Sequence, residues 1–324
     1  MKHHYWEPPI ALYLFLGGLA GAINFLMFIF QMFVFPDVEL GNAFVGPAVV
    51  SLFCIAIGCI FLIVDLGQPP KFYYVWCTAT SIIKWGATLL VICAFFCLFY
   101  AVSYLPWGWI APLAALFTPG RCLWLVVAGL TGFGIMVYTG VMLSTLKAHA
   151  FWATPALPIL FTVSAISTGC AAMILSMCVW PAEPVLADFV AAEAVRELLH
   201  TVDIILVISE LVILFIMVLS FLGAGNPTAK RAAKRWISGS YAVYFWVFMV
   251  LIGLLCPLAM YIGGGFAAVS IAPWFALFGG CTLRFLVVFN DDRAPLPGEE
   301  HYYERQKTDD ERYLSAWTYG ENQY

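Results

Sequence analysis

Charged residues are scarce in this sequence. Only 10% of its 324 residues are charged, whereas about a quarter are charged in an ordinary soluble domain. Hydrophobic residues make up 63% of the chain, and a water-soluble core cannot hide that much apolar surface. Basic residues are also too few to attract a polyanion, because 15 Lys and Arg against 19 Asp and Glu give a formal net charge of -4. These deficits predict an integral membrane protein and exclude nucleic-acid binding.

Metal-binding patterns are missing as well. The ten cysteines include no CxxC pair and no cluster-type spacing, which predicts buried core thiols and no iron–sulfur cluster in this chain. Most of them lie inside apolar runs: Cys54, Cys59, Cys93, Cys97, Cys170, Cys178 and Cys256. Of five histidines only His200 lies within an apolar run. Intramembrane haem held by two histidines is therefore not expected, nor is any metal site.

Long apolar runs are what the sequence does have. A bilayer core about 30 Å thick requires roughly 20 apolar residues per helix. Eight runs of this kind lie at about 10–35, 45–65, 81–104, 121–145, 155–180, 198–222, 239–261 and 266–289. The first is too long for a signal-peptide core and is interpreted as the first span. The sequence therefore predicts an all-α polytopic membrane domain over residues 1–290.

The two ends of the chain are expected on one side of the membrane, because the number of spans is even. The loops on that side hold most of the basic residues, and the positive-inside rule then places both termini in the cytoplasm. Residues 291–324 are rich in Asp, Glu, Arg and Tyr and show no apolar periodicity. They are interpreted as an extramembrane tail that contacts a partner subunit, with an unattached terminus as the alternative.

Ionisable residues concentrate on the sixth run. Arg196, His200, Asp203 and Glu210 share an arc of about 80° along about 21 Å of helix. Each costs about 2.5–3.5 kcal/mol at mid-membrane, so each requires a partner or a function. One interpretation is a proton pathway, with Glu210 deepest and His200 and Asp203 near its mouth. The alternative is a structural network in which Arg196 and His200 neutralise the two acids.

Arg284, on the last run, belongs with this group. It is either a further partner of Glu210 in the proton pathway or a structural residue, and the structural role is favoured. The sequence by itself leaves both interpretations open.

Three segments together resemble the NrfD/PsrC family of membrane subunits. The first is Trp6-Glu7-Pro8-Pro9 followed by Tyr13-Leu14-Phe15-Leu16-Gly17-Gly18-Leu19-Ala20-Gly21. The second runs from Asp65-Leu66-Gly67-Gln68-Pro69-Pro70-Lys71-Phe72 to Lys84-Trp85-Gly86, and the third from Tyr138-Thr139-Gly140 to Ser167-Thr168-Gly169-Cys170-Ala171. The combination covers most of residues 6–290.

The resemblance implies two related four-helix bundles in a prokaryotic inner membrane. It also implies a quinone or quinol, menaquinone or ubiquinone, bound near one membrane face. An iron–sulfur subunit would relay electrons between this site and a molybdopterin or other catalytic subunit. The expected topology agrees, because the start of the first helix and the ends of the second and fourth helices share one membrane side.

The resemblance also indicates candidate quinone-binding residues. Tyr138 matches the family tyrosine at the end of the fourth helix, and an interfacial-belt tyrosine is the alternative. Asp65 matches the family acid after the second helix, and a helix-end salt bridge is the alternative. The remaining candidates are Tyr13, Gln68, Trp6, Glu7 and His149, the last of which is more simply a solvated loop histidine. Gln68 departs from the family pattern, in which a basic residue is common at this position.

Two rival functions remain open from the sequence. Eight helices with an acid-lined interior suit an ion-coupled secondary transporter, although no helix shows a Gly- or Pro-broken midpoint matched in the other half. The other rival is a purely structural membrane anchor.

Overall fold

The computed structural model describes residues 8–65, 74–77, 81–105, 111–146, 149, 151–179, 186–223 and 227–290. Trp6, Glu7, Gln68 and the tail at 291–324 lie outside the described residues, and of Asp65 only the helical backbone is described. Within these ranges the chain is helical without a strand, and eight segments are long and apolar enough to cross a membrane. The predicted all-α polytopic fold is confirmed.

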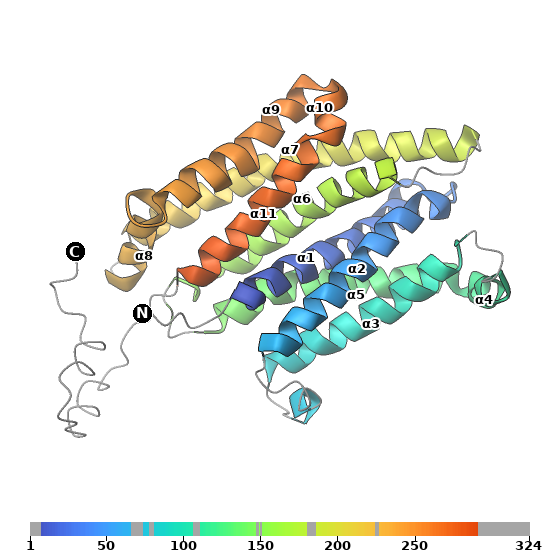
Figure 1. Cartoon of the computed structure of the whole chain (residues 1–324), viewed down its shortest axis with the longest axis horizontal. Helices are drawn as coiled ribbons and strands as arrows, with labels where there is room; N and C mark the ends of the chain where they lie inside the picture. Colours follow the sequence, from blue (N-terminus) through green and yellow to red (C-terminus); the bar gives the residue numbers. More distant parts are fainter. Residues whose placement is uncertain are drawn as a thin grey trace.

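The first four spans form one bundle. Its central helix α1 (Pro8–Ile29), extended by the π-helical turn η1 (Phe30–Val34), packs against α2 (Gly41–Asp65) and α5 (Arg121–Ser144). On its other side α5 packs against α3 (Ile82–Val102). A short helix α4 (Ala111–Phe117) and the 3₁₀ turn η3 (Thr118–Gly120) lead into α5. These helices form the blue-to-green part of Figure 1.

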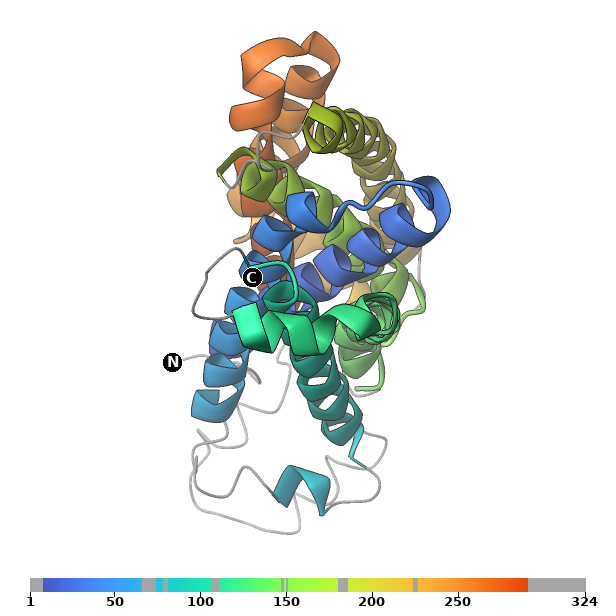
Figure 2. The ribbon, with the colours of Figure 1, turned by 90° about the vertical axis from the view of Figure 1, so that its right-hand side faces the viewer.

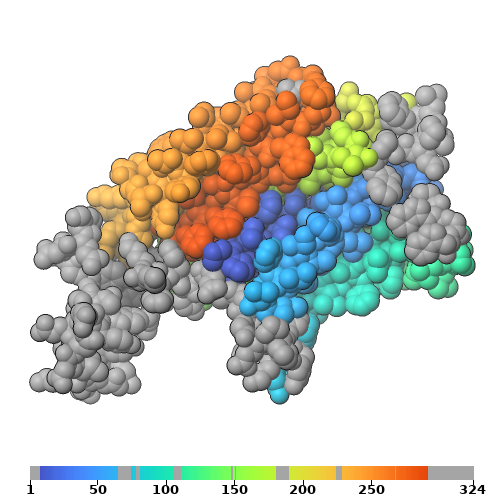
Figure 3. Space-filling model, viewed as in Figure 1, coloured from blue at the N-terminus to red at the C-terminus, as the bar shows by residue number. Residues whose placement is uncertain are grey.

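The last four spans form a second bundle. It consists of α6 (Ala156–Val179), α7 (Leu186–Gly223), a seventh span built from η4 (Tyr244–Leu255) and α9 (Cys256–Gly263), and α11 (Ala272–Phe289). The helix α8 (Pro227–Ile237) lies outside the spans, and α10 (Gly265–Ser270) leads into the eighth span. Figures 1 and 2 show this bundle against the first, with α6 and α1 at the junction, and Figure 3 shows the two packed closely together.

Glycines allow two pairs of helices to touch by their backbones. A Cβ added to Gly21 of α1 would lie 2.5 Å from the carbonyl oxygen of Gly132 on α5, and the reverse distance is the same. Gly253 of η4 and Gly279 of α11 meet in a similar way, with a Cβ added to Gly253 lying 2.4 Å from the opposite Cα. Small residues at such crossings give the close packing that membrane helices depend on.

Two helix boundaries differ from the sequence-based expectation. The sixth span begins at Leu186, well before residue 198, and the gap between the predicted runs 198–222 and 239–261 contains α8. Charged side chains end an apolar run without ending a helix, because outside the hydrocarbon layer they can remain solvated. Arg196 therefore lies inside α7 together with His200, Asp203 and Glu210.

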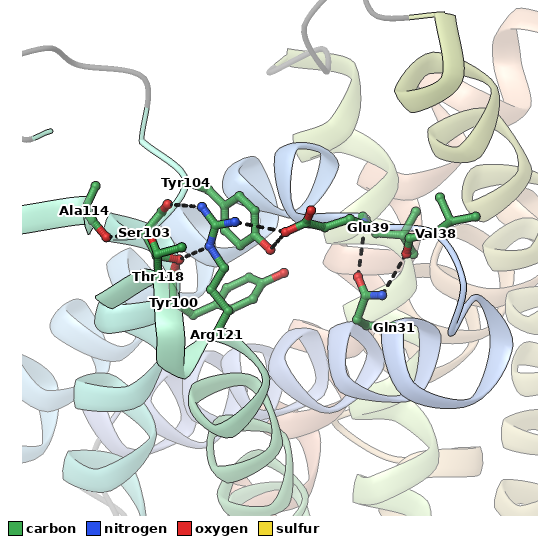
Figure 4. Close-up of polar contacts among 10 residues, drawn as sticks. Gln31, Val38, Glu39, Tyr100, Ser103, Tyr104, Ala114, Thr118 and Arg121 are labelled. Atoms are coloured by element: carbon green, nitrogen blue, oxygen red, sulfur yellow. Dashed lines mark hydrogen bonds and ion pairs between the residues drawn. The ribbon is translucent and has the colours of Figure 1, made fainter. Parts of the chain in front are cut away.

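We call the membrane face where α1 begins and α11 ends the terminal face, and the other the opposite face. On the opposite face Glu39 accepts hydrogen bonds from Arg121 Nη1 (2.9 Å) and from the Tyr104 phenol (2.7 Å) (Figure 4). Arg121 also donates to the Ser103 carbonyl oxygen (2.6 Å) and stacks over the Tyr104 ring. Burial and the bond to Glu39 raise the pKa of Tyr104, so the phenol remains a donor. Gln31 binds the backbone on both sides of Glu39.

Candidate functional site

Two tyrosines from different helices face each other near the terminal face. Tyr13 belongs to the second turn of α1 and Tyr138 to the last two turns of α5, and their side chains are 1% and 7% exposed. The Tyr13 phenol lies within hydrogen-bonding reach of the Tyr138 phenol. The Tyr138 hydroxyl donates to the sulfur of Met142 at 3.4 Å. We call Tyr13 and Tyr138 the tyrosine pair.

Glycines on two further helices make room for the tyrosine pair. A Cβ added to Gly86 of α3 would lie 2.2 Å from the ring carbons Cε1 and Cζ of Tyr138, so this ring occupies the space of a missing side chain. A Cβ added to Gly58 of α2 would lie 3.8 Å from the Tyr13 ring, which is ordinary contact. The tyrosine pair is thus enclosed by α1, α2, α3 and α5.

The other candidate quinone-binding residues are only partly placed. Asp65 is the last residue of α2, so the backbone that carries it ends at the same membrane face as the tyrosine pair (Figure 1). Gln68, Trp6 and Glu7 lie outside the described residues. The structure therefore brings Tyr13 and Tyr138 together and places the end of α2 on their side of the membrane.

His149 is buried between the bundles. Only 4% of it is exposed, and its ring stacks on Trp152 with 4.2 Å between the ring centroids. The Trp152 indole in turn donates to the carbonyl oxygen of Val287 near the end of α11 (2.7 Å). The interpretation of His149 as a solvated loop residue is therefore wrong, because the turn between α5 and α6 packs onto α11.

A second polar cluster lies inside the second bundle. Arg284 Nη1 donates to the Ser164 hydroxyl (2.5 Å) and the Gly280 carbonyl (3.1 Å), and Nη2 donates to the Phe161 carbonyl (3.1 Å). Glu210 is 2% exposed, interacts electrostatically with Arg284, and has the hydroxyl of Ser164 beside its carboxyl. The positive charge of Arg284 therefore acts on the buried acid Glu210, and Ser164 lies next to both.

Asp203 has no comparable cation among the described residues. One carboxyl oxygen accepts a hydrogen bond from the Ser167 hydroxyl (2.5 Å), and the other has no hydrogen-bond partner in the same part of the chain. The Tyr261 phenol lies beside this carboxyl without a hydrogen bond of regular geometry. The His200 ring meets the Tyr261 ring edge to face at 5.3 Å, and neither of its nitrogens is hydrogen-bonded within the described chain.

Arg196 does not neutralise these acids. It pairs with Glu193 one turn earlier on the same helix and contacts the sulfur of Cys178. The balancing charge for Glu210 comes from Arg284 instead.

Sequence reasoning missed three residues of this cluster: Ser164, Ser167 and Tyr261. Their uncharged side chains give no signal in an apolar run beyond the spacing of the two serines on one helix face.

The two clusters approach each other across α1. A Cβ added to Gly18 would lie 3.9 Å from Arg284 Nη2 and 4.0 Å from the Thr139 hydroxyl, and Thr139 directly follows Tyr138. The Arg284 guanidinium is therefore near the bundle junction. Within the described ranges, no three His, Cys, Asp or Glu side chains are grouped to hold a metal ion.

These features define a polytopic membrane protein with buried polar residues inside each of two helix bundles. Residues 1–291 match the family described as polysulphide reductase, NrfD, and the chain belongs to that family. It is similar to the C subunit of polysulfide reductase from Wolinella succinogenes, 28% identical over 306 residues that cover 88% of this chain and 93% of that protein. It is also similar to protein NrfD of Escherichia coli, 27% identical over 324 residues that cover 88% of this chain and 94% of that protein. The predicted family is confirmed.

Proposed function

We propose that this chain is the membrane anchor and quinone-binding subunit of a multisubunit respiratory oxidoreductase. It would exchange electrons between menaquinone or ubiquinone in the bilayer and an iron–sulfur subunit, and through that subunit with a molybdopterin or other redox catalytic subunit. The name of the Wolinella relative denotes one of several subunits of a reductase, which supports membership of a complex. The tail at 291–324 would contact the partner subunits.

The observation that carries the proposal is the hydrogen bond of Tyr138. Its phenol donates to a thioether sulfur, which is a weak acceptor, although the group lies in an apolar site where a strong acceptor would be favoured. A quinone carbonyl is such an acceptor. The Tyr138 ring occupies the space beside Gly86, which holds the phenol donor in place. Tyr13 provides a second phenol next to it.

The remaining chemistry falls to groups at the same face. Oxidation of a quinol releases two electrons, which would pass to the iron–sulfur subunit, and two protons. Asp65 at the end of α2 would accept protons, with Glu7 and His149 as further acceptors, while Gln68 and Trp6 would contribute to binding the head group. The reverse direction, quinone reduction, uses the same groups with proton flow reversed.

The Tyr138→Phe variant tests this proposal. It removes one hydroxyl and keeps the ring, so we expect quinol-linked electron transfer by the whole complex to fall roughly tenfold, the value of one lost hydrogen bond. Steady-state turnover with a soluble quinol analogue measures the effect. The matched control is Tyr100→Phe, which removes a buried phenol of α3 that has no hydrogen-bond partner in the described chain. Equal activity of both variants would contradict the proposal.

A second function, proton translocation, is favoured by the buried acids of α7. Asp203 and Glu210 lie on one helix with His200, and two serines of α6 bind or approach their carboxyls. We propose that these residues, together with Arg196 and Arg284, form a proton pathway coupled to the redox step. Glu210→Gln is expected to lower proton uptake by complexes in vesicles during turnover. Unchanged turnover together with unchanged proton uptake would exclude the pathway.

The proposed orientation places the terminal face in the cytoplasm, because basic residues gather there. A reporter enzyme that is active only outside the cytoplasm, fused to the C-terminus, should be inactive.

Purification in mild detergent separates the rival functions: an iron–sulfur partner with extractable quinone supports the proposal. A lone chain that moves solute in liposomes would instead indicate a transporter, and a complex without quinone would indicate a structural anchor.

A further inference from the structure

The helix α8 connects the sixth and seventh spans at the terminal face (Figure 1). Its sequence, PTAKRAAKRWI, contains four basic residues and no acid. These residues are two adjacent pairs, Lys230-Arg231 and Lys234-Arg235, spaced four residues apart. Residues four apart lie on the same side of a helix, so the four basic residues share one side of α8. This side carries a high positive charge density for a chain whose net charge is negative.

The other side of α8 is fixed to the second bundle. Ala229, Ala232, Ala233 and Trp236 are buried, and the Trp236 ring packs against Phe151 and Phe245. Asn290, the residue after α11, donates a side-chain hydrogen bond to the Ala232 carbonyl (3.2 Å). The helix is thus held in one orientation, and Lys230 and Lys234 are exposed on its outer side.

Aromatic residues locate α8 at the depth of the lipid head groups. Tyr244 and Trp246, at the start of the seventh span, are 54% and 49% exposed. Exposed tyrosine and tryptophan at the ends of spans mark the membrane–water interface. The Trp246 indole donates to the carbonyl oxygen of Ile237, the last residue of α8 (3.1 Å), so the helix lies at the level of this aromatic belt.

We propose that α8 is a binding site for anionic phospholipid, with Lys230 and Lys234 contacting head-group phosphates. A fixed interfacial helix with a basic outer side and an apolar inner side has the charge distribution that attracts such lipids. This inference concerns a surface away from the tyrosine pair and is independent of the proposed quinone function.

The test compares the whole protein in lipid nanodiscs of phosphatidylcholine alone and of phosphatidylcholine with phosphatidylglycerol. For the unmodified chain we expect bound phosphatidylglycerol by native mass spectrometry and a Tm that rises with its content. In Lys230→Gln/Lys234→Gln we expect binding about 30-fold weaker and no rise in Tm, because each basic residue at a membrane surface contributes measurably to anionic-lipid binding. Lys230→Arg/Lys234→Arg should behave like the unmodified chain, since it keeps both charges.

Two results would overturn the inference. The control Lys84→Gln removes a lysine near the terminal face of the first bundle and should leave phosphatidylglycerol binding unchanged. If it weakens phosphatidylglycerol binding as much as the α8 variant does, the effect is a general one of charge. A Tm loss in the glutamine variant that is the same in phosphatidylcholine alone would show that the two lysines stabilise the protein without anionic lipid.

Discussion

In Gly86→Ala, quinol-linked electron transfer is expected to fall about 100-fold, the scale of an ångström-sized displacement in an active site. The new Cβ would overlap the Tyr138 ring at 2.2 Å, so this buried ring must change its position beside Tyr13. The donor hydroxyl must therefore move away from its position. Overpacking of this kind also lowers stability by about 1–3 kcal/mol.

Gly58→Ala is the matched control for this variant. It makes the same chemical change on a neighbouring helix, where the added methyl would lie 3.6 Å from Leu16 and 3.8 Å from the Tyr13 ring, both ordinary contacts. Its turnover should stay within about twofold of the unmodified complex, given contacts at normal van der Waals distance. If Gly86→Ala retains turnover while a density map shows the Tyr138 ring displaced, the phenol is not the quinone ligand.

Arg284→Met is expected to destabilise the protein by about 3–5 kcal/mol, because it leaves the buried Glu210 carboxyl without the positive charge that acts on it. Arg284 is fully buried, offsets the charge of Glu210, and also bonds to the hydroxyl of Ser164 and the carbonyls of two helices. The loss should appear as a lower Tm in detergent and as a lower yield of folded protein.

A double-mutant cycle with Glu210→Gln separates electrostatics from packing. If Arg284 stabilises the fold by balancing Glu210, the double variant Arg284→Met/Glu210→Gln should recover part of the stability lost in Arg284→Met. Additive losses would show that Arg284 acts through its bonds to α6 and α11 and not through the charge of Glu210. Arg284→Lys keeps the charge but not the planar fork of donors, so it should fall between these cases.

The number of spans could be predicted from the sequence because the hydrocarbon thickness sets the length of each apolar run. The boundaries were less predictable. Glu193, Arg196 and Glu197 end the apolar run of α7 but not the helix, and the basic segment of α8 was interpreted only as a break. The end of an apolar run indicates where the hydrocarbon layer ends. The helix itself can continue beyond that point, because its backbone hydrogen bonds do not depend on apolar side chains.

The candidate site was predictable only in part. The spacing of His200, Asp203 and Glu210 predicts a shared helix face, and the structure places them on one, with Asp203 and Glu210 fully buried. No spacing rule indicates that Ser164 and Ser167 of another helix meet these acids. The proximity of Tyr13 to Tyr138 likewise depends on glycines such as Gly86, whose importance appears only when the facing ring is known. Roles for these residues remain predictions to be tested.

The central position of α1 has a consequence for biogenesis. This helix contacts α2, α5, α6 and α11, and 72% of the most apolar stretch of its span is buried within the chain. Translation proceeds from the N-terminus, so the first segment to enter the bilayer acquires its last neighbour only when the final helix has been made. Until then, the side of α1 that receives α11 faces lipid or an insertion chaperone, and nascent chains stalled before residue 272 should be the forms most readily removed by membrane proteases.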